Sequence, residues 1–317
     1  MNRLAIFSAA LVLAGTATGT VTVKAQTVID LERGGTVRAK TMDDYEQEQG
    51  FKNRMEADSV AYVDHLRRAF NALHRDSLDE AERLFSQALK KRPDAPGNYI
   101  VRYNLGRIAM GRNRFREAID LFGQVLKQRP DQLEARYDRA VCYAEINSLQ
   151  AAREDCDQLL ESVQEHDLKM RGLFLKSAIQ MRSHQPDKAR ETLETILRED
   201  PENEGAALLL AGAYEQMGQP QESLSRLNLF VAAHPENTDG LLARAGLEER
   251  LQMDDMARAD YDAAIRLLPK EAELYVKRAR VLLRLGEKGA ARKDLDQAGA
   301  LGYPRSVLNA LFQELRK

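Results

Sequence analysis

Apolar residues recur at helical spacing in short stretches along most of the chain. One stretch places them at Leu78, Ala81, Leu84, Phe85, Ala88 and Leu89. A spacing of three or four residues puts them on one face of a helix. A polar turn such as Gly218-Gln219-Pro220 separates each stretch from the next. The pattern predicts pairs of amphipathic helices that are joined by tight turns.

These helix pairs repeat at a fixed period. Pro201, Pro235 and Pro269 lie 34 residues apart, and Pro93 and Pro130 hold the same place in two earlier copies. Counting back from each proline, small residues recur 24 and 12 places before it, and a bulky residue recurs eight places before it. The small residues at the first place are Ala69, Gly106, Ser177, Ala211 and Ala245. Those at the second are Ala81, Ala118, Ala189, Ser223 and Ala257, and the bulky residues are Phe85, Phe122, Leu193, Leu227 and Tyr261. Two further copies lack the proline but keep the frame, with Ala140, Tyr143, Ala152 and Cys156 in one and Ala279, Leu282, Ala291 and Leu295 in the other.

The recurring residue types have a mechanical explanation. Small residues where paired helices cross allow the helix axes to approach closely, and the bulky residue fills the space beside them. Proline ends the second helix because it lacks a backbone donor and disfavours helical geometry in the residue before it. One helix pair cannot bury its own apolar face, so stacked copies must share a continuous core.

This pattern resembles the tetratricopeptide repeat family over residues 62 to about 303. The resemblance implies an all-α fold, a right-handed α-solenoid of about seven helix-turn-helix repeats. The copies begin near Tyr62, Tyr99, Leu133, Met170, Glu204, Thr238 and Ala272. Two junctions are offset by 37 residues, so three residues are inserted near Ala95–Gly97 and three near His166–Leu168. We expect a longer loop at each insertion, with a local change in superhelix curvature as the alternative.

The two ends of the repeat array have different patterns. Residues 304–317 predict a final amphipathic helix that caps the last exposed face, with Pro304 at its first helical position. Residues 26–61 predict a flexible segment around Gly34-Gly35 and then a polar helix after Thr41, which we expect to pack against the first repeat.

The first 25 residues predict a cleaved signal peptide. Arg3 precedes an apolar run from Leu4 to Gly15, which is too short for a permanent membrane span, and Ala25 suits the cleavage site. An uncleaved anchor is the alternative. We therefore expect an exported bacterial protein, periplasmic or secreted, with no integral membrane span in the mature chain.

Charge and motif content favour a binding protein over an enzyme. The formal net charge is -2, and removal of Arg3 and Lys24 with residues 1–25 makes it -4. That balance and the expected export argue against nucleic acid as a partner. There is no nucleophile elbow, phosphate loop or dinucleotide fingerprint, and the histidines lack metal-ligand spacing. We expect no cofactor and no metal, and we assign carboxylates such as Glu154, Asp155 and Asp157 mostly to solvated helix faces.

Two features leave alternatives open. Cys142 and Cys156 lie in one repeat and fit either a disulfide or two buried core residues. Residues 90–129 carry ten basic and three acidic residues, whereas residues 130–167 carry three basic and ten acidic residues. Adjacent copies then either neutralise each other across their interface or form a bipolar groove that orients a charged peptide.

The resemblance also implies a binding surface, because the first helix of each copy lines the concave face in this family. Groove positions are the second, fifth, sixth and ninth places of each copy. They supply the candidate peptide-binding residues Tyr103, Asn104, Arg107, Glu134, Tyr137, Asp138, Arg171 and Phe174. Tyrosine, arginine and phenylalanine often dominate binding energy, although ordinary packing between helices explains the aromatic residues equally well.

The sequence therefore predicts a non-catalytic scaffold or adaptor that binds a protein or peptide in the concave groove. The alternative is a structural subunit of a cell-envelope assembly or uptake system that acts through its convex or end surfaces, since fold does not fix function. An unrecognised hydrolase is a distant third.

Overall fold

The computed structural model describes residues 11–12, 24–25 and 57–315, and its described fold is all-α apart from one short strand pair. The strands β1 (Leu11–Val12) and β2 (Lys24–Ala25) pair antiparallel, with Leu11 opposite Ala25. The segment expected to be flexible and the polar helix expected after Thr41 lie outside the described residues, as does most of the predicted signal peptide.

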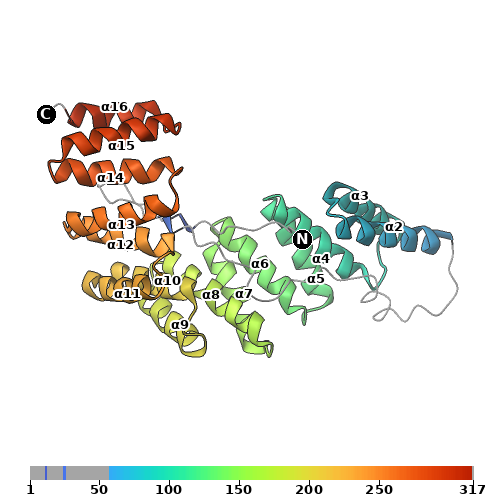
Figure 1. Cartoon of the computed structure of the whole chain (residues 1–317). Helices are drawn as coiled ribbons and strands as arrows, with labels where there is room; N and C mark the ends of the chain where they lie inside the picture. The colour runs from blue at the N-terminus through green and yellow to red at the C-terminus, as the bar shows by residue number, and fades with distance from the viewer. Residues whose placement is uncertain (1–10, 13–23, 26–56, 316–317) are drawn as a thin grey trace. The chain divides into compact units, whose positions relative to one another are not determined.

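The helices fall into two compact units (Figure 1). Unit 1 contains α2 (Ala57–His74), α3 (Leu78–Lys91), α4 (Asn98–Gly111), α5 (Phe115–Gln128), α6 (Leu133–Glu145), α7 (Leu149–Ser162) and α8 (His166–Arg182). Unit 2 contains α9 (Pro186–Glu199), α10 (Glu204–Gln216), α11 (Pro220–Ala233), α12 (Thr238–Arg250), α13 (Asp254–Leu267), α14 (Ala272–Arg284), α15 (Lys288–Ala300) and α16 (Arg305–Glu314). Within each unit every helix packs against the next one in the chain, so the predicted solenoid of helix pairs is confirmed.

The turn inside each copy has the same backbone geometry. The fifteenth residue of every copy adopts a positive φ, between 52° and 79°. These residues are Asp76, Asn113, Asn147, His184, Gly218, Gln252 and Gly286. In six of these turns the backbone N–H of the next residue donates back into the first helix, as from Arg114 to the carbonyl of Ala109 at 2.9 Å, which closes the helix end in the manner of a Schellman motif. Seven turns at one register confirm the seven copies counted in the sequence.

The two insertions have different structural outcomes. Residues 92–97 form a longer loop between α3 and α4, as expected. The insertion near His166–Leu168 forms the first turn of α8 and does not lengthen a loop. The expectation of a longer loop was wrong at this junction. Leu168 is buried and begins an apolar stripe that continues through Leu175 and Ile179 at helical spacing. That burial explains why the added residues are helical.

The capping helix is present at the end of unit 2. Leu308 and Leu311 of α16 are buried in one cluster with residues of α14 and α15, and Figure 1 shows the three helices stacked in order. Pro304 is the N-cap residue of α16, one position before the place expected for it. Its φ of -56° still suits a helix start.

Candidate functional site

All eight candidate residues lie on three first helices of unit 1. Tyr103, Asn104 and Arg107 are on α4, and the other five are on α6 and α8. Residues of α6 approach both α4 and α8, so the three helices are neighbours. We call the surface formed by α4, α6 and α8 the first-helix face.

A buried carboxylate joins α4 to α6. The hydroxyl of Tyr103 donates to Oδ2 of Asp138 at 3.1 Å, and Nε of Arg107 lies 3.9 Å from the same oxygen. Asp138 is only 3% exposed, and this burial raises its pKa against the opposing effect of Arg107 and Arg171. Burial, followed by the neighbouring Asp138 charge, raises the pKa of Tyr103 well above its usual value. Tyr103 therefore stays a hydrogen-bond donor, and the bridge fixes α4 against α6.

A cation–aromatic contact joins α6 to α8. The guanidinium carbon of Arg171 lies 4.3 Å from the centre of the Tyr137 ring, within the range of an attractive cation–π interaction. Burial raises the pKa of Tyr137 to about 12, so the phenol stays neutral beside the cation. Arg171 also lies 4.0 Å from Asp167 in the added first turn of α8. The insertion therefore supplies a carboxylate that helps to orient Arg171.

The remaining candidates differ in exposure. Asn104 is 2% exposed and donates to the carbonyl of Ile100 in its own helix at 2.9 Å, so its side chain is used inside the fold. Glu134 is exposed and Phe174 is half-buried. Tyr103 and Tyr137 are each 4% exposed. The tyrosines thus support the face from beneath, whereas Glu134 and Phe174 can touch a partner directly.

A set of arginine–aspartate pairs with buried carboxylates was not predicted from the sequence. Each pair joins the seventh residue of a copy to its twenty-third residue, with two nitrogen–oxygen distances between 2.6 and 2.8 Å. The pairs are Arg139–Asp155, Arg244–Asp260 and Arg278–Asp294. Asp155 is 3% exposed, so its assignment to a solvated face was wrong. The signal was an arginine and an aspartate sixteen residues apart at one repeat register.

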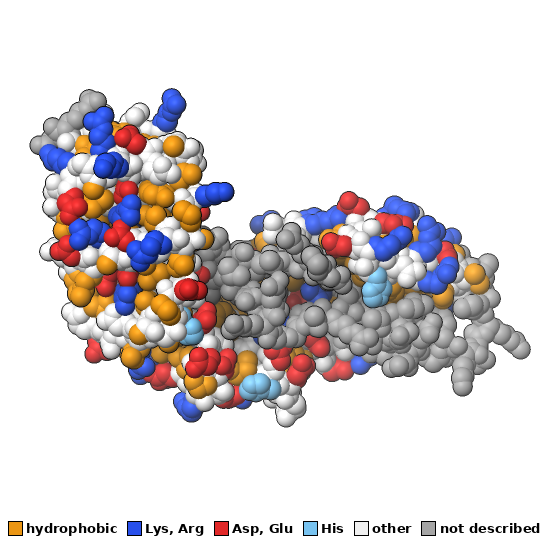
Figure 2. Space-filling view, viewed as in Figure 1, with side chains coloured by type: hydrophobic (Ala, Val, Ile, Leu, Met, Phe, Trp, Pro, Cys, Tyr) orange, Lys and Arg blue, Asp and Glu red, His pale blue; other side chains and the backbone are white. Residues whose placement is uncertain are grey.

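The two charge blocks of unit 1 neutralise each other only in part. Arg107–Asp138 and Arg129–Asp131 are ion pairs between the basic block and the acidic block. Arg112 and Arg114 pair instead with acidic residues of α3, which precede both blocks. Both proposed explanations of the charge pattern therefore keep some support. In unit 2, Figure 2 shows basic and acidic side chains interspersed with hydrophobic ones on the visible face.

The two cysteines are core residues. Cys142 and Cys156 are both free and 0% exposed, which confirms the core interpretation over the disulfide. Burial raises the pKa of both thiols, that of Cys156 to about 12. Neither thiol is therefore activated as a nucleophile in this structure.

Two further findings concern only the residues that the structure describes. No group of three or more histidine, cysteine, aspartate or glutamate side chains in that part is placed to hold a metal ion. None of the helices described between residues 57 and 315 combines the length and the apolar character needed to cross a membrane.

Comparison with known sequences gives a consistent result. Two family models, both described as tetratricopeptide repeat, match residues 103–166 and 180–247. A search of curated proteins gives no significant match.

Comparison with solved structures shows the same fold. A tetratricopeptide repeat protein from Parabacteroides merdae ATCC 43184 is 23% identical with a TM-score of 0.66, covering 81% of this chain and 100% of its own. PilF of Pseudomonas aeruginosa is 15% identical with a TM-score of 0.51, covering 68% of this chain and 95% of its own. Residues 41 to the end of MamA from Desulfovibrio magneticus RS-1 give 17% identity and a TM-score of 0.50, covering 58% of this chain and 99% of that one. At these identities the likeness concerns the fold alone.

Proposed function

Because this chain is a tetratricopeptide repeat protein, we propose that it is a non-catalytic scaffold that holds a protein or peptide against the first-helix face of unit 1. The repeats themselves indicate a generic protein-interaction scaffold. The choice of the first-helix face rests on the arrangement of charged and aromatic side chains across α4, α6 and α8.

The observation that carries this proposal is the buried support beneath the face. Asp138 holds Tyr103 and lies beside Arg107, while Tyr137 lies under Arg171. These contacts restrict both arginines before any partner arrives, so less side-chain entropy is lost on binding.

Above this support the face offers groups of different chemistry. Arg107 and Arg171 are partly exposed cations, Glu134 is an exposed anion and Phe174 is a half-buried aromatic ring. Both signs of charge lie close to an aromatic surface. This combination suits a peptide that presents charged side chains and one apolar anchor.

Site-specific photocrosslinking in intact cells tests the proposal. A photoreactive amino acid replaces Glu134 or Phe174, and matched variants carry it at Glu154 or Glu161, which are exposed on the second helix α7. We expect a discrete protein adduct from the two first-helix positions and none from the α7 positions. Adducts from α7 with none from Glu134 or Phe174 contradict the proposal.

The alternative is a structural subunit of an envelope assembly that acts through its second helices. One observation favours it, because Leu229 on α11 and Met256 on α13 are apolar yet 66% and 55% exposed. Exposed apolar side chains of this kind mark interaction sites when they form a contiguous patch. Crosslinks from Leu229 and Met256, with none from Glu134 and Phe174, support this alternative.

Export to the periplasm or the medium is also part of the proposal, and it rests on the sequence of residues 1–25 alone. Amino-terminal sequencing of the protein isolated from its source tests it. A mature chain that begins at Gln26 supports cleavage after Ala25, and a chain that retains Leu4 to Gly15 contradicts it.

A further inference from the structure

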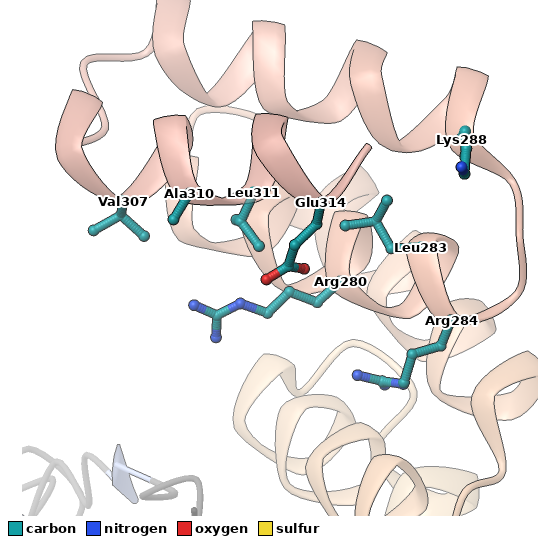
Figure 3. A pocket seen from close by; sticks show the side chains of 8 residues that line it. All are labelled: Arg280, Leu283, Arg284, Lys288, Val307, Ala310, Leu311 and Glu314. Atoms are coloured by element: carbon teal, nitrogen blue, oxygen red, sulfur yellow. The ribbon is translucent and has the colours of Figure 1, made fainter. Parts of the chain in front are cut away.

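A cavity of about 620 Å³ lies at the end of unit 2, between the last repeat and the capping helix (Figure 3). Helix α14 contributes Arg280, Leu283 and Arg284, and α15 contributes Lys288 at its first residue. The wall formed by α16 consists of Val307, Ala310, Leu311 and Glu314. The lining therefore combines three basic side chains with a largely apolar wall.

The basic side chains differ in how far they are already neutralised. Arg284 lies 2.7 Å from both Asp254 and Glu249. Arg280 and Lys288 are exposed, and neither side chain has an ion pair among the described residues. Glu314 is the one carboxylate in the lining. Figure 3 shows Glu314 beside the Arg280 side chain, so Arg280 and Lys288 together leave the lining with an excess of positive charge.

The α16 wall carries more apolar surface than the cap requires. Leu308 and Leu311 already pack into the core of the last repeat. Val307, Ala310, Leu311 and Glu314 follow helical spacing and form a second face, which Figure 3 shows turned towards Arg280. Ala310 is exposed and Val307 is half-buried. Leu283 is the only apolar residue that α14 contributes to the lining.

We propose that this cavity is a binding site for an acidic segment of a partner protein that carries an apolar side chain. The guanidinium of Arg280 and the ammonium of Lys288 bind carboxylates, for which they supply charge-assisted hydrogen bonds. The apolar side chain packs against Leu283, Val307 and Ala310. A free small anion would satisfy the cations but leave this wall in water, so the cavity favours a peptide. The site is separate from the first-helix face and does not depend on it.

Fluorescence anisotropy with the full chain tests this site. The probe is a short fluorescein-labelled peptide in which glutamates flank leucine. Two reference peptides replace the glutamates by lysine or the leucine by serine. We expect the acidic leucine peptide to bind at low salt, the lysine peptide not to bind, and the serine peptide to bind about tenfold more weakly, the effect of roughly 1.4 kcal/mol.

Two charge-matched variants separate the cavity from general electrostatics. R280A/K288A removes two cations of the cavity, whereas R292A/K293A removes two exposed cations of α15 that do not line it. We expect R280A/K288A to weaken binding of the probe about tenfold or more and R292A/K293A about twofold or less. Circular dichroism checks that both variants keep their helix content. The proposal is overturned if the probe does not bind, or if both variants lose affinity equally.

A second copy of this chain is the other possible occupant. Sedimentation velocity over a range of protein concentrations detects it. Self-association that disappears in R280A/K288A but persists in R292A/K293A identifies the occupant as another copy and overturns the proposal of an acidic partner peptide.

Discussion

In unit 1 a buried aspartate connects the first helices of neighbouring copies, whereas the buried aspartates of unit 2 connect a first helix to a second helix, as Asp155 also does within unit 1. Asp138 joins α6 to Tyr103 of α4 in unit 1. In unit 2 the guanidinium of Arg278 lies between Asp294 of its own copy and Asp262 of the preceding copy. The same repeat therefore accommodates buried polar contacts between neighbouring first helices and between a first and a second helix.

The apolar cores differ in the same sense. Two large clusters lie in unit 1, one from Tyr62 of α2 to Cys142 of α6 and one from Tyr137 of α6 to Ile179 of α8, whereas the core of unit 2 is divided into smaller clusters. The seventh and twenty-third places differ between copies. Copy two has Leu105 and Leu121 there, and copies six and seven have an arginine and an aspartate. The repeat frame therefore accepts either an apolar or a charged pair at these places.

Removal of one member of such a pair should have the largest effect on stability. R244L leaves Asp260 and Glu248 buried without their cation, and we expect a loss of about 3–5 kcal/mol in the free energy of unfolding. Replacing both partners in R244L/D260L should recover the part of that loss that comes from Asp260, since copy two tolerates an apolar pair at these places, while Glu248 stays without its cation. Urea unfolding followed by circular dichroism measures both values. A double variant as unstable as R244L contradicts this account of the pair.

Close packing of unit 1 predicts the next effect. A Cβ atom at Gly106 would lie 2.6 Å from Cε1 of Phe122, a ring that is fully buried. G106A should therefore destabilise unit 1 by about 2 kcal/mol through overpacking. G123A is the matched control on α5, where an added Cβ atom would lie 3.6 Å from Nη1 of Arg139. We expect G123A to raise stability by about 0.5–1 kcal/mol, since alanine is the better helix former. Equal effects of the two variants in urea unfolding would contradict this prediction.

Glu248 of unit 2 should make stability depend on pH near neutrality. Glu248 is 4% exposed, and burial raises its pKa to about 7, with the charge of Asp260 adding to the shift and Arg244 opposing it. The folded state therefore holds this proton more tightly than the unfolded state does. Protonated Glu248 therefore contributes to the free energy of unfolding at low pH, and this contribution is lost as the pH rises through about 7.

E248Q should remove this dependence on pH. Relative to the E248Q variant, the wild-type chain should lose about 2 kcal/mol of stability between about pH 5 and about pH 8. The exposed Glu273 on α14 provides the control E273Q, which should follow the wild-type curve. Parallel curves for E248Q and the wild type would show that Glu248 does not titrate in this range.

The turns inside the copies predict the smallest difference. Unit 1 places aspartate or asparagine at the positive-φ position, and these residues tolerate it well. In unit 2, Gln252 adopts a φ of 60°, where a glutamine is strained. We expect Q252G to raise stability by about 0.5–1 kcal/mol and N113G by less, as measured by thermal unfolding. A larger gain from N113G would reverse this ranking of the two turns.

The sequence predicted the helix pairs and the number of copies because both follow from residues that recur at a fixed period. It did not predict that the insertion at His166–Leu168 is helical, because three residues without proline or glycine fit a loop as well as a helical turn. It placed Tyr103 and Asp138 on one face but not in contact. Which of two polar side chains is buried depends on packing between copies, and the pattern within one copy does not contain that information.

Exposure explains why the buried pairs were missed. An aspartate such as Asp155 is usually found at the surface, so its residue type alone predicted a solvated helix face. Its burial depends on Arg139, which lies on another helix. The position within the repeat would have predicted this burial better than the residue type, because Arg244 and Arg278 occupy the same position in their copies as Arg139 does in its own.

Binding at the first-helix face of unit 1 is the central claim, and the affinity for the crosslinked partner tests it most directly. The variant E134K/F174A changes one exposed and one half-buried residue of that face, and E154K makes the same charge change on α7. We predict about tenfold weaker binding for E134K/F174A and no more than about twofold for E154K, measured by isothermal titration calorimetry. Unchanged affinity in E134K/F174A would contradict the account.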